Sequence, residues 1–235
     1  MPLPRNIRPT YNTTLPSTGQ KIKYQPFSVK EEKILVLAAE SQEVDEMSNA
    51  IENILRNCIV SPSDLDIGSL ALFDIEYLFL KTRSKSAGER IEIIVSDPED
   101  EDYKVNHSIS IDKIGIKKSD GHEKMIKMDE NVVVNMKYPD LSFFVEGVSI
   151  NNLSDSIETV CKCIDSLIVD DEVFESENMT TPELVEWVES LTTEQFAKII
   201  KFFETMPKLS HTIKLTNERT GNPFTITLEG LADFF

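Results

Sequence analysis

The residues with the clearest potential for chemistry form an acidic run at positions 97–102. It reads Asp97-Pro98-Glu99-Asp100-Glu101-Asp102, and carboxylate oxygens are the ligands that hard cations such as Ca²⁺ prefer. The run lacks the ligand spacing and the glycine of an EF-hand loop, so a solvated turn between two strands is the simpler interpretation. A metal-dependent enzyme or cation-binding protein that uses this run is the alternative hypothesis for function.

The other metal-ligating and nucleophilic residues are dispersed along the chain. The cysteines are Cys58, Cys161 and Cys163. They form no disulfide framework, which favours reduced thiols in a cytoplasmic compartment. Two cysteines one residue apart, with no second pair nearby, indicate zinc only weakly. Cys58 lies on the apolar side of a predicted helix, where a small buried hydrophobe is a simpler role than a reactive thiol.

The motifs of common enzyme classes are absent. The chain contains no glycine-rich phosphate loop, no HExxH, no G-x-S-x-G and no CxxC pair. The histidines stand alone on predicted strands or loops, at His107, His122 and His211. The sequence therefore predicts no catalytic residue and no cofactor, and we expect a protein that is not an enzyme.

Composition argues against two further classes of protein, nucleic-acid binders and membrane-spanning proteins. The chain has 235 residues, 40% hydrophobic content and a formal charge of -17, so it can bury a core but carries too few cations for a nucleic-acid binder. We expect no cleaved signal peptide, because the first residues do not show a charged segment followed by an apolar one. No apolar run approaches the about 18 residues that a membrane span needs. We expect protein partners, with neither nucleic acid nor a membrane span.

Periodicity predicts an α+β fold in which helical and strand-like regions alternate. Between 151 and 169 the apolar positions recur at helical spacing, and the acidic stretch at 170–177 looks like a connector. The predicted regions are an extended arm with a hairpin at 1–26, helices at 27–88, a small antiparallel β meander at 89–138, helices at 139–206, and a β-hairpin with a short terminal helix at 207–235.

The densest apolar stretch runs from Leu70 to Leu80, and the rest of the fold has to cover it. As a helix it is apolar around nearly its whole circumference, interrupted by Asp74, Glu76 and Lys81. Either other parts of this chain or a partner must bury such a helix. The same alternatives hold for the closing aromatic pair, which either folds back into the core or inserts into a partner. The residues predicted to contact a partner are Phe73, Tyr77, Leu80, Leu231, Phe234 and Phe235.

Three segments carry a resemblance to a known family. They are Lys23–Leu35 (KYQPFSVKEEKIL), Leu72–Glu89 (LFDIEYLFLKTRSKSAGE) and Leu228–Phe235 (LEGLADFF). In their order and their amino-acid sequences, these segments resemble the baseplate hub proteins of T4-like contractile-tailed bacteriophages. Similar proteins can carry CxxC pairs in two hairpins that here read Ser96–Glu99 and Asn217–Thr220. Without those thiols a zinc knuckle is lost, so these hairpins must hold by ordinary pairing and packing.

The resemblance implies a non-enzymatic tail protein that acts in assembly of the baseplate's central hub. It would be a hub subunit or an assembly chaperone, present in the host cytoplasm during assembly, with the virion tail baseplate as its other location. Its partners would be other baseplate hub or tail proteins, and self-association into a homo-oligomer stays open.

Overall fold

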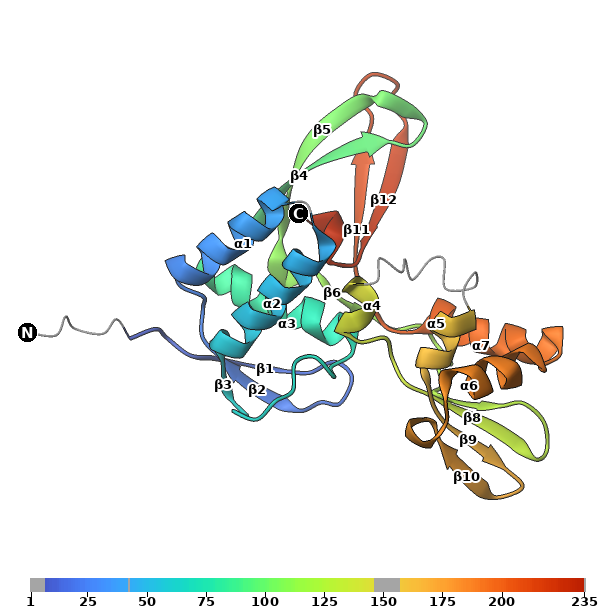
Figure 1. Cartoon of the computed structure of the whole chain (residues 1–235). Helices are drawn as coiled ribbons and strands as arrows, with labels where there is room; N and C mark the ends of the chain where they lie inside the picture. The colour runs from blue at the N-terminus through green and yellow to red at the C-terminus, as the bar shows by residue number, and fades with distance from the viewer. Residues whose placement is uncertain (1–6, 42, 146–156, 235) are drawn as a thin grey trace, which may run out of the picture. The chain divides into compact units, whose positions relative to one another are not determined.

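The computed structural model describes residues 7–41, 43–145 and 157–234, and its fold is α+β as predicted (Figure 1). The chain divides into two compact units. Unit 1 comprises residues 1–117 and 208–235, and unit 2 comprises residues 118–207. Unit 2 is thus an insertion into unit 1.

In its described residues, unit 1 combines three α-helices and two short 3-10 helices with three small antiparallel sheets. The predicted N-terminal hairpin is confirmed as β1 and β2, and its turn uses Gly19 at a φ of 72°. The sheets are ordered β1-β2-β3, β4-β5 and β12-β11-β6. The elements are β1 (Tyr11–Thr14), β2 (Lys21–Tyr24), α1 (Val29–Ser41), α2 (Val44–Cys58), β3 (Ile59–Ser61), α3 (Leu72–Ser86), β4 (Arg90–Asp97), β5 (Asp100–Ser110), η1 (Ile111–Lys113), β6 (Gly115–Lys117), β11 (Lys208–Thr216), β12 (Pro223–Glu229) and η4 (Leu231–Phe234).

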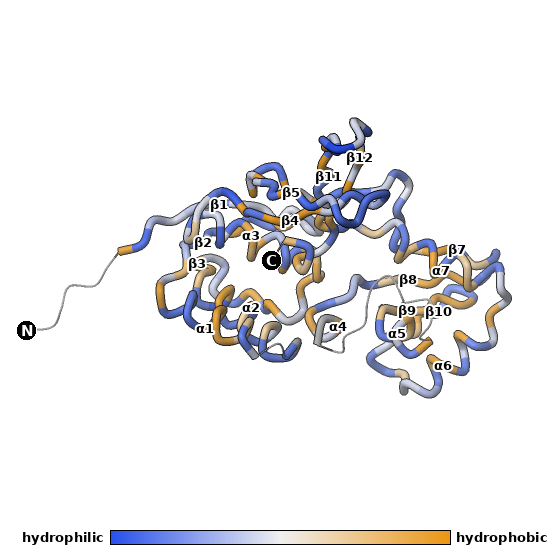
Figure 2. Tube along the Cα trace, turned by 90° about the horizontal axis from the view of Figure 1, so that it is seen from above, coloured by the Kyte–Doolittle hydropathy of each residue, from blue (hydrophilic) through white to orange (hydrophobic). Residues whose placement is uncertain are grey.

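Helix α3 is the predicted apolar helix, and the chain itself covers it. Ile75, Leu78 and Phe79 are each 1% exposed. Helix α2 contacts it, and apolar segments recur along α1 and α2 in Figure 2. The buried apolar residues of α2 recur at helical spacing: Ala50, Ile51, Ile54, Leu55 and Cys58. Burying one such side chain contributes about 2 kcal/mol. The buried residues of α3 come from every side of the helix, so it lies in the core and is not a surface element.

Two carboxylates of α3 are buried with its apolar residues, and each accepts a backbone N–H from one end of the chain. Asp74 is 0% exposed and accepts the N–H of Ser17 at 3.0 Å, as well as the Ser17 hydroxyl. Glu76 accepts the N–H of Leu231 at 2.8 Å. Gly230, at a φ of 71°, lies so close that a Cβ atom there would stand 3.2 Å from the Glu76 Oε1 atom. The central helix therefore fixes both the N-terminal hairpin and the C-terminal segment.

Unit 2 is an antiparallel sheet ordered β10-β9-β8-β7 with helices packed on one face. Its core includes Val134 and Leu167 from the sheet and Ile199 and Phe203 from α7. Thr180 and Thr192 each begin a helix with a complete capping box, whose Thr-x-x-Glu and Thr-x-x-Gln spacing is present in the sequence. The elements are β7 (Met125–Lys127), β8 (Val132–Met136), α4 (Leu141–Val145), α5 (Ile157–Lys162), β9 (Ile164–Val169), β10 (Glu172–Glu175), η3 (Ser176–Asn178), α6 (Thr181–Glu189) and α7 (Thr193–Thr205).

The expected single meander at 89–138 is wrong, because its strands belong to three different sheets. β4 pairs with β5, β6 pairs with β11, and β8 pairs with both β7 and β9. β6 lies next to β11, whose Lys208 is the register partner of Lys117. The chain therefore leaves unit 1 and returns to it at two directly paired residues.

The predicted helix at 151–169 is also wrong in its second half. Residues 151–156 lie outside the described residues, α5 ends at Lys162, and Ile164–Val169 is the strand β9. The expected connector after it contains the strand β10. The β-branched Ile164, Ile168 and Val169 suit a strand, and pairing on both sides with β8 and β10 decides in its favour.

We predict that the buried carboxyl of Glu76 makes unit 1 less stable as pH rises. Burial raises its pKa from 4.5 to about 7, against the smaller lowering effect of the Leu231 N–H. Between these values the folded chain keeps a proton that the unfolded chain has lost, so stability falls by about 3 kcal/mol from pH 4.5 to pH 7. Glu76→Gln keeps an acceptor for Leu231 without the charge, and should remove this loss.

The measurement is urea unfolding of the wild type and the variant at pH 4.5, 6 and 8. Glu92→Gln, at an exposed position of β4, is the matched control and should leave the pH profile of the wild type unchanged. A Glu76→Gln variant that loses as much stability between pH 4.5 and pH 7 as the wild type would contradict this role of Glu76.

We predict that Asp171→Gly stabilises unit 2. The turn between β9 and β10 places Asp170 at a φ of 49° and Asp171 at 67°, a conformation that costs side-chain-bearing residues energy and suits glycine. The substitution should raise the free energy of unfolding by about 0.5 kcal/mol, measured by urea denaturation. Glu172→Gly removes the same charge from the adjacent strand position and should destabilise; equal effects of the two variants would refute the turn argument.

Candidate functional site

The acidic run forms the tip of the β4–β5 hairpin, and its first carboxylate is buried. Asp97 is 3% exposed and accepts a hydrogen bond of 2.7 Å from the Nδ2 atom of Asn217, which is 0% exposed. The same amide lies 3.3 Å from the Oδ2 atom of Asp100. The β11–β12 turn that contains Asn217 is thereby joined to the tip of β4–β5. An amide and two carboxylates therefore connect the two hairpins.

Asn217 also organises its own turn. Its Oδ1 atom accepts the N–H of Arg219 at 2.9 Å and that of Thr220 at 3.3 Å. Beside this joint, the Arg219 guanidinium lies 5.7 Å from the centre of the Tyr103 ring, and that ring meets Phe224 edge-on at 6.2 Å. The two hairpins are therefore held by a polar joint and an aromatic contact.

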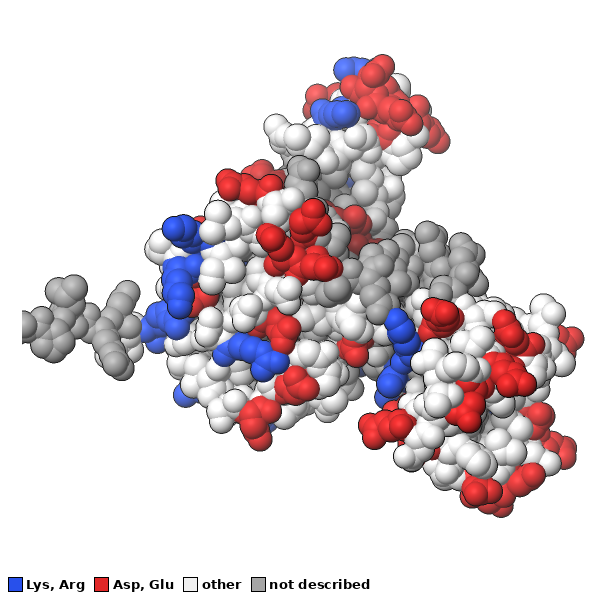
Figure 3. Space-filling view, in the orientation of Figure 1, with Lys and Arg blue, Asp and Glu red and all other residues white. Residues whose placement is uncertain are grey.

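The arrangement does not present the acidic run as a cation site. Glu99, Glu101 and Asp102 are exposed, and acidic side chains gather at the tip of the two hairpins in Figure 3. The Oδ2 atom of Asp100 lies 3.9 Å from Arg219. Across residues 7–41, 43–145 and 157–234, no three His, Cys, Asp or Glu side chains are grouped so that they could hold a metal ion. The geometry thus gives the cation-binding alternative no support.

The cysteines are buried and free, as expected for Cys58. Burial raises the pKa of Cys58 to about 12 and that of Cys161 to about 11. It also raises the pKa of Cys163, which is 0% exposed although the helical pattern places it off the apolar face. The pattern fails there because the helix ends at Lys162. Protonated, buried thiols are poor nucleophiles and poor metal ligands.

The histidines do not converge, and His122 is part of an aromatic cluster in unit 2. Its Nδ1 atom lies 2.9 Å from the Thr205 hydroxyl and its Nε2 atom 3.1 Å from the Tyr138 hydroxyl. Burial, with Lys124 nearby, lowers its pKa. The ring also packs against Phe202 at 5.1 Å. His122 therefore joins α7 to the residues around β7 and β8 as a neutral packing group.

Four of the six side chains predicted to contact a partner lie in the core of this chain. Tyr77 is half-buried, its hydroxyl 3.2 Å from Thr13, and Phe235 lies outside the described residues. The buried four are Phe73, Leu80, Leu231 and Phe234, with exposed fractions of 4%, 2%, 6% and 0%. The fold-back alternative holds for Phe234, because η4 packs it inside unit 1. Partner contact through these side chains stays a prediction, and it requires this part of the core to open.

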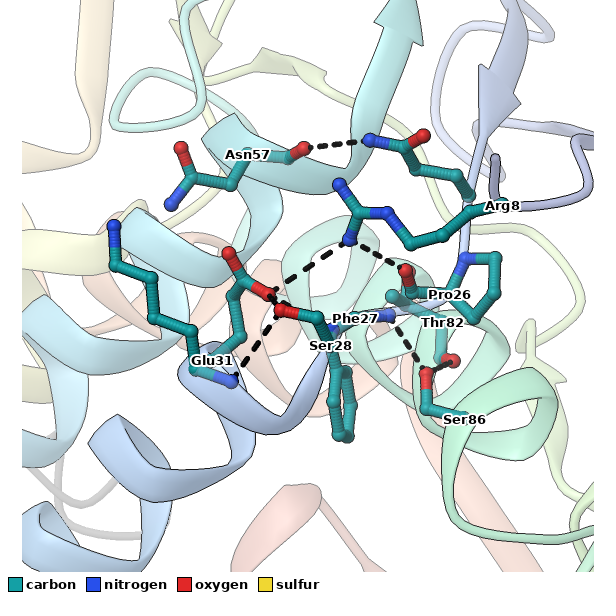
Figure 4. A network of polar contacts seen from close by, with 10 residues as sticks. Arg8, Pro26, Phe27, Ser28, Glu31, Asn57, Thr82 and Ser86 are labelled. Carbon is teal, nitrogen blue, oxygen red and sulfur yellow. Dashed lines mark hydrogen bonds and ion pairs between the residues drawn. The ribbon is translucent and has the colours of Figure 1, made fainter. Parts of the chain in front are cut away.

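Sequence reasoning missed a polar network that fastens the N-terminal arm to the helices (Figure 4). Arg8 donates to the Pro26 carbonyl at 2.8 Å and lies 3.7 Å from Glu31. Glu31 accepts the backbone N–H of Ser28 at 2.8 Å, as expected for a capping box. Burial raises the pKa of Glu31, but the Ser28 hydrogen bonds and Arg8 outweigh it, so that this pKa lies below its ordinary value.

The same network continues to α3, where the Phe27 N–H donates to the Ser86 hydroxyl at 2.8 Å and that hydroxyl donates to the Thr82 carbonyl at 2.7 Å. Here, as at Asp74 and Glu76, ionisable and hydroxyl groups hold backbone in place. Only Ser28 and Glu31 had a sequence signal, which is their capping-box spacing.

We predict that Asn217→Ala destabilises unit 1 by about 2 kcal/mol, because it leaves the buried Asp97 carboxylate without its amide donor. Asn222→Ala, at an exposed position of the same turn, is the matched control and should change the free energy of unfolding by less than about 0.5 kcal/mol. Chemical denaturation of both variants checks this. Equal, small effects would show that the joint between the hairpins contributes little.

The comparisons with known proteins agree with the resemblance carried by the three segments. The family model described as T4 bacteriophage base plate protein matches residues 8–235. No curated protein and no solved structure matches the chain. In the parts of the chain that the structure describes, no helix has the length and apolar character that crossing a bilayer takes. The family match extends through unit 1 and unit 2, and the chain belongs to the T4 bacteriophage base plate protein family.

Proposed function

We propose that this protein acts in assembly of the central hub of a phage baseplate, as a hub subunit or an assembly chaperone, and that it catalyses no reaction. The family match over residues 8–235 carries the proposal, because it places the chain among baseplate proteins. Its work would lie in the host cytoplasm during assembly and, for a subunit that stays, in the tail baseplate of the virion. Its partners would be other hub or tail proteins.

The polar chemistry of the described residues supports a role in contact. The buried Asp74, Glu76 and Asp97 accept hydrogen bonds from Ser17, Leu231 and Asn217 respectively. Each of these bonds joins segments that are far apart in the sequence. Such hydrogen bonds hold the chain in one conformation. A protein that assembles with others then presents its partners with a preformed surface.

The proposal predicts that a phage with an amber codon early in this gene makes tails that stop before the hub is complete. Electron microscopy of lysates from a non-suppressing host measures this, and the wild-type chain supplied from a plasmid should restore normal tails. Normal tails without the chain would refute a role in hub assembly.

A subunit and a departing chaperone differ in the finished particle. Mass spectrometry of purified virions should find peptides of this chain at a fixed ratio to tail proteins if it is a subunit. If it is a chaperone, the peptides should be present in assembly intermediates and lost from virions.

A further inference from the structure

We propose that the free edge of β10 in unit 2 is a docking site for an extended, basic segment of another protein. β10 (Glu172–Glu175) is an end strand of the β10-β9-β8-β7 sheet, and all four of its residues are exposed. Among the described residues, only β9 pairs with it. In an antiparallel ladder every second residue directs its N–H and C=O groups away from the paired neighbour. β10 can therefore pair with one more strand.

The strand presents an apolar side chain on each face of the sheet. Val173 is 53% exposed and Phe174 is 41% exposed. Phe174 is in register with Leu167 and, through β9, with Val134, both members of the unit 2 core. Val173 continues the opposite face beside Ile168. Exposed edges are usually protected by short length, charged side chains, proline or a cover. β10 is short and has a glutamate at each end, but between these glutamates it extends two apolar rows of its own sheet.

The negative charge around this edge favours a basic segment as its occupant. Unit 2 holds 19 of the acidic residues and 7 of the basic ones, so it carries -12 of the formal charge of -17. Acidic side chains are spread over the face of unit 2 that Figure 3 shows. Next to the two apolar residues lie the Asp170-Asp171 turn, Glu172 and Glu175. Two copies of this edge would repel each other, whereas a strand with Lys or Arg on both sides of two adjacent apolar residues would match both the charges and the apolar side chains.

This inference rests on the proposed function only in taking the occupant to be a segment of another baseplate protein. The recognition itself follows from β-strand addition, in which the backbone supplies affinity and the alternate side chains supply specificity. Its test uses a synthetic probe and needs no phage partner.

The probe is a fluorescein-labelled peptide of two Lys-Val-Val-Lys repeats, which can set two apolar residues beside Val173 and Phe174 and a lysine beside Glu172 and Glu175. It is titrated with the full-length chain at low salt. We expect saturable binding by fluorescence anisotropy and, with ¹⁵N-labelled chain, amide shifts centred on β10. A peptide with Glu in place of Lys should not bind. A peptide of the same charge with proline at every third position should bind at least tenfold more weakly. Equal binding of the proline peptide would overturn strand addition, and so would amide shifts centred elsewhere.

The apolar contacts are tested by Val173→Thr combined with Phe174→Thr, which keeps residues suited to a strand. This double variant should bind the Lys-Val-Val-Lys peptide at least fivefold more weakly. Ile94→Thr, which changes a 70% exposed apolar residue on β4 of unit 1, should bind like the wild type. Equal losses in both, or no loss in the double variant, would overturn the assignment of the surface.

The charge contacts are tested in the same way. Glu172→Gln with Glu175→Gln should weaken binding more than Glu186→Gln with Glu189→Gln, which removes two charges from exposed positions of α6 in the same unit. Equal effects would mean attraction to the overall charge of unit 2, and would overturn the site. Peptide binding at β10 in a protein whose loss leaves tails normal would refute the proposed function alone.

Discussion

The fold depends on burying α3 on all sides although two of its residues are carboxylates. A buried carboxyl without a donor is costly, so the helix can be covered only by segments that bring N–H groups to Asp74 and Glu76. Ser17 and Leu231 do this from opposite ends of the chain. The apolar surface of α3 and its two carboxyl groups are thus covered by the same segments of the chain. Burial of Glu76 under these segments raises its pKa to about 7.

Unit 2 is inserted between two strands of unit 1 that pair with each other. The chain departs after Lys117 and returns at Lys208, and these residues are register partners on β6 and β11. An insertion closed by a paired residue at each end keeps the β12-β11-β6 sheet continuous. It also lets unit 2 form a core of its own from its sheet and helices. Most of the net charge, -12 of -17, belongs to this unit, whose surface is acidic around a separate core.

The residues whose types suggest a metal site or a catalytic site have structural roles. The acidic run becomes one half of a joint between hairpins, because Asp97 is buried against Asn217. The thiols fill core space, and His122 is a neutral member of an aromatic cluster. A connection of this kind between the β4–β5 and β11–β12 hairpins needs donors and acceptors at fixed positions. The Asn217 amide between the carboxylates of Asp97 and Asp100 provides them.

Local signals in the sequence determined much of this protein. The N-terminal hairpin with Gly19, the helix Val44–Cys58, the apolar helix α3 and the helix starts at Thr180 and Thr192 follow from turn residues, periodicity and capping, which act over a few positions. The tertiary structure alone decided that Ile164–Val169 is a strand, that β6 pairs with β11, and that Leu231 reaches Glu76. Those outcomes depend on partners up to 155 positions away. The free energy of such a contact depends on two segments at once, so it cannot be predicted from the sequence of either segment alone.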